Sequence, residues 1–223
     1  MTIQKVLNEF LAEQRERLAP RRFAQYEQTI QLLQHSLNSY AYQGLSAADQ
    51  KRLNAGEREF CEVFGPEHIL PNTGEFLGYF MIRKVIAGKE LVRAAGTVIK
   101  RLAGWLEKKG YVDADKAAAA KRRGAKAARD LPLADELGTP MNAFAEQQPR
   151  VRPDQVIEGH FQIQGVRPDA LQLEDYTSGE EIGWVPVSPE ISKRAKPGWT
   201  FSGAIARLRG KWRLLEAWNV YPD

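Results

Sequence analysis

The sequence predicts an α+β protein of two domains, in which an all-helical bundle precedes a small five-stranded β-barrel. Two patterns of apolar residues along the chain predict this class. Apolar residues recur at helical spacing in the first half, and they alternate with polar residues after about residue 150. We expect the bundle over 1–112, a basic linker that contains first alanines and then prolines over 113–150, and the barrel over 151–223.

The helical half divides at proline, glycine and polar stretches. An apolar stripe that includes Ile3 and Phe10 predicts the first helix, and Pro20 suits the opening turn of the second. Gly110, after a basic pair, suits the end of the last helix. The predicted helices cover residues 3–18, 20–40, part of 46–64, 75–87 and 89–109.

The linker has two parts. Residues 113–130, DADKAAAAKRRGAKAARD, predict a basic helix that cannot pack deeply, because it has no large apolar side chain. From Leu131 to Pro153 the chain contains four prolines, which predicts an extended segment.

The last part of the chain shows the period of two that is typical of strands. In the first strand, Ile157, Phe161 and Ile163 share one face. Arg209-Gly210 predicts a tight hairpin turn between the last two strands. The expected order is a strand over 156–166, a second around 171–173, a third over 182–187, a short helix over 189–196, and strands over 199–208 and 211–221. This order matches an OB-like barrel, and an SH3-like barrel is the alternative.

The composition excludes several classes of protein. The 223 residues suit one or two domains, and a single cysteine, Cys61, excludes a disulfide framework and a cysteine zinc site. With three histidines at scattered positions, we expect no metal and no cofactor. No apolar run is long enough to span a membrane, and the N-terminus is not a secretory signal. We therefore expect a cytoplasmic protein with no membrane partner.

The basic surplus lies in the first half of the chain. The net charge is +4, and residues 1–112 carry 16 basic and 12 acidic residues, whereas residues 151–223 carry 9 and 10. This distribution permits a polyanionic partner for the helical half.

Two segments of the helical half carry a resemblance to a known family. The segment LAPRRFAQYEQTIQLLQHSL has a proline, a basic pair (Arg21-Arg22), then Tyr26 and an apolar helix. The segment TVIKRLAGWLEKKGYV has the basic pair Lys100-Arg101 before a leucine, an aromatic-leucine pair and a glycine. Over about residues 3–112 the chain resembles the SAM-like core-binding domain of tyrosine recombinases and phage integrases.

The catalytic part of that family has no counterpart here. Recombination needs a nucleophilic tyrosine, two arginines and acid-base groups positioned together around one phosphate. After residue 112 the chain has one histidine, His160, and no Arg…His-x-x-Arg…Tyr arrangement. Nor does it contain a phosphate-binding loop, a dinucleotide-binding motif or a nucleophile elbow. We therefore expect no catalytic residues and no enzyme activity.

The resemblance implies that the helical domain clamps duplex DNA with basic side chains on two helices. The implied DNA-binding residues are Arg21, Arg22, Gln25, Lys89, Arg93, Thr97, Lys100 and Arg101. Two further basic groups are possible secondary nucleic-acid contacts: Lys121, Arg122 and Arg123 in the linker, and Arg207, Arg209, Lys211 and Arg213 around the last hairpin.

Other interpretations of the same residues remain open. The basic helix faces are also what solvated helices show, and the linker cluster also suits a solubilising segment. Trp212, Leu214, Trp218 and Val220 share a strand face, which favours burial over base stacking. The alternative function is a module that binds a protein, or RNA, through the barrel and does not bind DNA.

Overall fold

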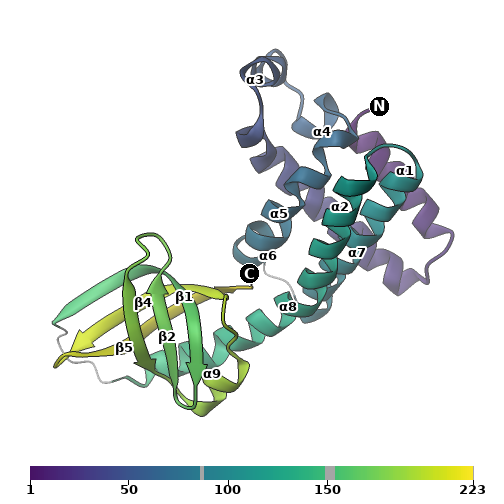
Figure 1. Cartoon of the computed structure of the whole chain (residues 1–223). Helices are drawn as coiled ribbons and strands as arrows, with labels where there is room; N and C mark the ends of the chain where they lie inside the picture. Colours follow the sequence, from purple (N-terminus) through teal and green to yellow (C-terminus); the bar gives the residue numbers. More distant parts are fainter. Residues whose placement is uncertain (86–87, 149–153, 223) are drawn as a thin grey trace. The chain divides into compact units, whose positions relative to one another are not determined.

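The computed structural model describes residues 1–85, 88–148 and 154–222, and it confirms the α+β class. Helices form the first part of the chain, and a five-stranded antiparallel sheet forms the last part (Figure 1). The chain divides into two compact units, Met1–Arg129 and Asp130–Asp223.

Local sequence explains where the main helices of the first unit begin. The Thr2 hydroxyl accepts from the backbone N–H of Lys5, Pro20 occupies the first turn of its helix, and the Ser46 hydroxyl accepts from the backbone N–H of Asp49. The elements are α1 (Ile3–Arg15), α2 (Pro20–Tyr40), η1 (Ala41–Gly44), α3 (Ala47–Asn54), α4 (Phe60–Val63), η2 (Pro66–His68), η3 (Leu70–Asn72), α5 (Thr73–Glu75), η4 (Phe76–Phe80), α6 (Met81–Arg83), α7 (Lys89–Lys108) and the first half of α8 (Ala114–Glu146).

Two of the expected helices differ in detail. The segment 46–64 forms α3 and α4 instead of one helix, because a capping box between Glu59 and Glu62 starts a new helix after Gly56. The helix expected over 75–87 runs from Thr73 to Arg83, with a wider π-helical turn over Phe76–Phe80, and residues 86–87 lie outside the described part of the chain.

The linker is the largest correction to the sequence-based expectations. Residues 131–146 are not extended, because α8 continues through Pro132 and Pro140 to Glu146, and residues 149–153 of the expected extended segment lie outside the described part of the chain. The alanine-rich first half of α8 also packs deeply, which its lack of large side chains had argued against. Ala117 and Ala120 are buried, and Gly124 lies against Gly96 of α7, so small residues let the two helix backbones approach closely.

The second unit contains the end of α8, the five strands and one short helix. Its elements are β1 (Gln155–Arg167), β2 (Ala170–Asp175), β3 (Glu181–Pro186), α9 (Pro189–Arg194), β4 (Thr200–Leu208) and β5 (Lys211–Tyr221). The hydrogen-bonded order is β3-β2-β1-β4-β5, with all neighbours antiparallel. The outer strands β3 and β5 come close to each other, so the sheet curls around its core.

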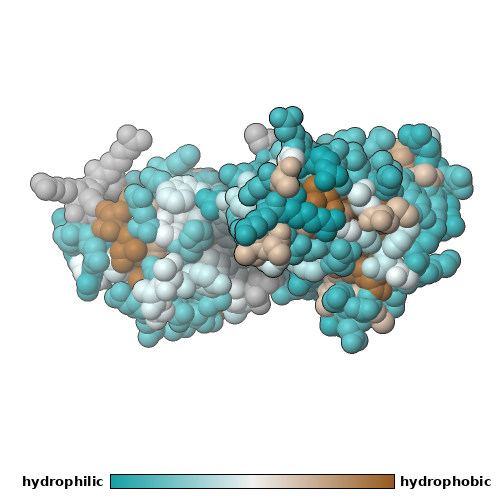
Figure 2. Space-filling view, turned by 90° about the horizontal axis from the view of Figure 1, so that it is seen from above, coloured by the Kyte–Doolittle hydropathy of each residue, from teal (hydrophilic) through white to brown (hydrophobic). Residues whose placement is uncertain are grey.

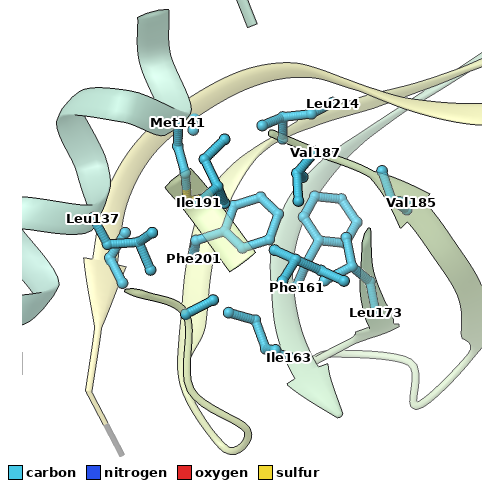
Figure 3. Close-up of a cluster of buried hydrophobic side chains, with 14 of the residues drawn as sticks. Leu137, Met141, Phe161, Ile163, Leu173, Val185, Val187, Ile191, Phe201 and Leu214 are labelled. Atoms are coloured by element: carbon cyan, nitrogen blue, oxygen red, sulfur yellow. The ribbon is translucent and has the colours of Figure 1, made fainter. Parts of the chain in front are cut away.

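Figure 3 shows this core, in which Phe161 of β1 and Phe201 of β4 lie among aliphatic side chains from the other strands. Leu137 and Met141 of α8 join the same cluster and are fully buried. The second half of α8 is therefore part of this unit's core.

One expected core residue is exposed. Trp218 has 47% of its surface exposed, although Leu214 and Val220 are buried as expected and Trp212 packs partly against the core. The pairing of β4 with β5 shifts register twice, next to Gly203 and next to Ile205. At each shift β5 contains one extra residue, which reverses the face of the sheet toward which the following side chains point.

Candidate nucleic-acid interface

A shared aromatic contact brings the first half of α2 and the second half of α7 against the middle of α1. Phe10 of α1 stacks with Tyr26 of α2 at 6.1 Å between ring centroids. The same Phe10 ring meets Trp105 of α7 edge-on at 5.5 Å. The three rings are buried, so they fix the positions of the polar residues one helical turn away.

Around these rings lies a groove with a volume of about 780 Å³, which we call the basic groove. It receives residues from α1, α2, α7 and α8, and Glu13 is the one carboxylate of the described chain that lines it. Its cations are Arg17, Arg22, Lys100, Arg101, Lys108, Lys109 and Lys121.

A second hollow, of about 580 Å³, adjoins the basic groove. The two share Arg22, Tyr26 and Thr97 as lining residues, so they form one continuous surface along α2 and α7. The second hollow adds Arg21, Gln25 and Arg93 to this surface. Thr97 itself donates its hydroxyl to the backbone oxygen of Arg93 at 3.3 Å, as a threonine inside a helix commonly does.

Some of these cations are neutralised within the protein. The Nη2 atom of Arg21 donates to both carboxylate oxygens of Glu90, at 3.1 Å to each. Lys121 pairs with Glu107. Lys109 pairs with Glu9 at 2.7 Å and with Glu13 at 2.6 Å.

Other cations have no such partner. Within the described part of the chain, no carboxylate pairs with the side chains of Arg22, Arg93, Lys100 or Arg101, and all four residues are exposed. They come from two helices and lie on one continuous surface. Unpaired cations gathered on one concave surface attract a polyanion.

The contacts of Lys109 belong to a network of hydrogen bonds and ion pairs that connects α1 to the C-terminal end of α7. Trp105 donates its indole N–H to Glu13 at 2.9 Å, and Tyr111 donates its hydroxyl to Glu9 at 2.9 Å. The hydrogen bonds from Lys109 and these partners lower the pKa of both carboxyl groups, and the carboxylates raise the pKa of Lys109. Glu13 is therefore held as a fixed anion that orients Lys109.

The aromatic residues of the groove cannot serve as stacking platforms. Tyr26 is 6% exposed and Trp105 is 7% exposed. A single-strand binder presents the faces of its rings to the bases. Apart from the carboxylates of Glu13 and Glu90, the polar side-chain groups of this surface are ammonium, guanidinium, amide and hydroxyl groups, which suit phosphate oxygens and base edges.

Most of the residues implied by the family resemblance come together on this surface. Seven of the eight line it: Arg21, Arg22, Gln25, Arg93, Thr97, Lys100 and Arg101. The side chain of the eighth, Lys89, lies outside the described part of the structure. Sequence reasoning missed Arg17, and it took Lys108 and Lys109 only as a helix end. These residues lie beside the groove because of how α1 and α7 pack together, and no local sequence pattern predicts that packing.

The linker cations separate into three environments. Lys121 lines the basic groove, Arg122 is exposed on α8, and Arg123 donates to the hydroxyl of Thr73 at 2.9 Å. Arg123 therefore fixes α8 against the start of α5. The four cations of the last hairpin surround the β4–β5 turn, in the second unit.

Other kinds of site find little support in the described residues. These contain no cluster of three or more His, Cys, Asp or Glu side chains that could hold a metal ion, and no helix among them is both long and apolar enough to cross a bilayer. Cys61 is buried, which raises the pKa of its thiol to about 12. Figure 2 shows a face covered mainly by hydrophilic residues, with small separate hydrophobic patches.

The comparisons with known proteins add no relative. No family model matches the chain, and neither does any curated protein or solved structure. Any functional inference therefore depends on the surface itself.

Proposed function

We propose that this protein binds duplex DNA, without a catalytic step, through the surface formed by the basic groove and the hollow beside it. The observation that carries the proposal is that Arg22, Arg93, Lys100 and Arg101 are exposed on this surface and that none of them pairs with a carboxylate in the described chain. They come from α2 and α7, which pack against each other, so their spacing is fixed by two rigid helices.

The proposed mechanism is neutralisation of phosphates by these cations. Each phosphate that is neutralised releases condensed counterions, which drives binding and makes the affinity depend steeply on salt. Gln25 and Thr97 line the same surface and offer neutral hydrogen-bonding groups that suit base edges. The cations would thus bind the phosphate backbone of the DNA, and the start of α2 would lie in a groove of the duplex.

Two finer fold assignments belong to the same proposal. We take the first unit as a SAM-like core-binding domain, on the motifs of α2 and α7 that border the groove. We take the second unit as an OB-like barrel. Its strand order, the approach of β3 to β5, and the position of α9 between β3 and β4 support this assignment.

The experiment is a binding titration of the full chain with a labelled mixed-sequence duplex at low salt. We expect Lys100→Ala/Arg101→Ala to weaken binding on every duplex sequence, because phosphate contacts carry no sequence information. The matched control is Lys5→Ala/Lys51→Ala. It removes two exposed helical cations of the same unit that line neither hollow.

Equal affinity of the groove variant and the control would refute the assignment of this surface. If the unaltered chain bound no duplex at low salt, the protein would not be a DNA-binding one. Capture experiments for a protein partner or for RNA would then follow.

A further inference from the structure

The turn between β4 and β5 carries a second concentration of positive charge. Arg207, Arg209, Lys211 and Arg213 lie within seven residues, and the first three are exposed. None of these side chains pairs with a carboxylate in the described part of the chain. The cluster belongs to the second unit, whereas the basic groove belongs to the first.

The backbone conformation at the first residue of this turn, Arg209, is unfavourable for an arginine. Arg209 has φ of 49° and Gly210 has φ of 77°. Two consecutive positive φ values are typical of a type I′ hairpin turn, which favours Asn-Gly because asparagine tolerates the left-handed region. At the β1–β2 turn the residue with positive φ is Asp169, at 64°, and aspartate tolerates this region better than arginine does. Arginine is therefore an uncommon residue at this position, which makes Arg209 a candidate for a role other than forming the turn.

The tip is also held rigidly. The backbone N–H of Arg209 donates to the carboxylate of Asp154 at 2.8 Å, and the backbone N–H of Asp154 donates to the oxygen of Arg207 at 2.8 Å. The guanidinium of Arg207 lies over the ring of Trp212, whose body packs partly against the core. These contacts fix the backbone of the tip and the guanidinium of Arg207, and a cation that is already positioned loses little entropy when it binds a ligand.

The cations of the tip face both sides of the hairpin. Arg207 pairs across the strands with Trp212, and Arg213 belongs to the next pair, with Ala206. Because successive pairs point to opposite faces, Arg207 and Arg213 lie on opposite faces of the two-stranded ribbon. An acidic peptide or a single strand that lies on one face could meet only some of these charges. A duplex groove has a phosphate strand on each side, and its major groove admits a two-stranded β-ribbon.

We propose that the β4–β5 hairpin tip is a second DNA-binding site, which enters a groove of duplex DNA and contacts the phosphates of both strands. This site is independent of the basic groove, so either proposal can fail without the other.

The test uses the full chain and a labelled mixed-sequence duplex, with the corresponding single strand as a second probe. The variant is Arg209→Asn/Lys211→Gln, which removes two charges and places asparagine where the turn favours it. The control is Lys51→Gln/Lys193→Gln, which removes two exposed charges far in sequence from the tip. Thermal unfolding of each variant establishes that it folds.

We expect the tip variant to bind the duplex roughly tenfold more weakly than the control at low salt, with a smaller loss on the single strand. We also expect the slope of log affinity against log salt to fall by about 2, since each phosphate contact contributes about 0.9. Duplex affinity equal to that of the control would overturn the proposal, even if the groove variant is weakened. A loss confined to the single strand would overturn insertion into a duplex. Failure of the unaltered chain to bind either probe would overturn both proposals.

Discussion

Gly96 of α7 and Gly124 of α8 lie so close together that a Cβ atom at position 96 would stand 2.5 Å from the carbonyl oxygen of Gly124. The same atom would stand 2.3 Å from the backbone nitrogen of Ala128. Such distances are shorter than any real Cβ contact, and the atoms involved are backbone atoms that cannot rotate away. This crossing holds the first half of α8, with Lys121, against the helix that carries Lys100 and Arg101.

We expect Gly96→Ala to destabilise the protein, because α7 and α8 must separate to admit the methyl group. A cost of about 1–3 kcal/mol in the free energy of unfolding is typical of such overpacking. Gly138→Ala is the matched control in α8, where an added Cβ would meet no atom within 4 Å. It should stabilise the helix by up to about 1 kcal/mol. Urea unfolding of both variants measures the difference, and equal effects would mean that the crossing is looser than described.

The turn at Arg209 gives a prediction of the opposite sign. A left-handed backbone costs an ordinary L-residue about 1–2 kcal/mol, and asparagine bears this cost more easily. We therefore expect Arg209→Asn alone to raise the midpoint of thermal unfolding. Arg207→Gln is the comparison, because it also removes a tip charge but has no positive φ to relieve. If Arg209→Asn lowered the midpoint, the arginine would be stabilising the turn through its side chain instead of straining it.

The hydrogen-bond network that joins Glu9 and Glu13 of α1 to Lys109 and its neighbours predicts that stability depends on pH. Glu9 and Glu13 have pKa values below the ordinary 4.5, first because they accept hydrogen bonds from Lys109. A carboxyl group whose pKa is lowered by folding stabilises the folded state above its ordinary pKa. That contribution is lost as the pH falls through the lowered value.

We expect Glu9→Gln/Glu13→Gln to unfold more easily than the unaltered protein at neutral pH and to lose less stability on acidification below about pH 4.5. Denaturant unfolding across that range measures this. Glu16→Gln/Glu57→Gln is the control, since neither side chain has a hydrogen-bond or ion-pair partner in the described chain. If the control variant lost equally little stability on acidification, the removal of negative charge in general, and not the loss of these hydrogen bonds, would cause the effect.

The elements with a strong repeating pattern were predictable. Helices α2 and α7 follow apolar stripes with clear start and stop residues, and β1 buries Phe161 and Ile163 at alternate positions. The gathering of Arg22 with Lys100 followed from a resemblance in two short segments. Nothing else in the sequence places two residues 78 positions apart beside each other.

The second half of α8 was not predictable from its prolines, because tertiary packing overrides the local preference. A proline inside a helix removes one hydrogen bond, but Leu137, Met141 and Ala145 recur at helical spacing and are buried in the core of the second unit. Trp218 was misplaced for a different reason. A strand pattern fixes the face of each residue only until a bulge inserts an extra one, and β5 contains such shifts.

The most direct test of the central claim is the salt dependence of duplex binding by the full chain, compared between the unaltered protein and Lys100→Ala/Arg101→Ala. If the basic groove holds the phosphate backbone, affinity falls steeply as salt rises, and the variant's slope of log affinity against log salt is smaller by about 2. The Lys5→Ala/Lys51→Ala control should keep the slope of the unaltered protein. Identical slopes and affinities for all three proteins would contradict the assignment of this groove to DNA.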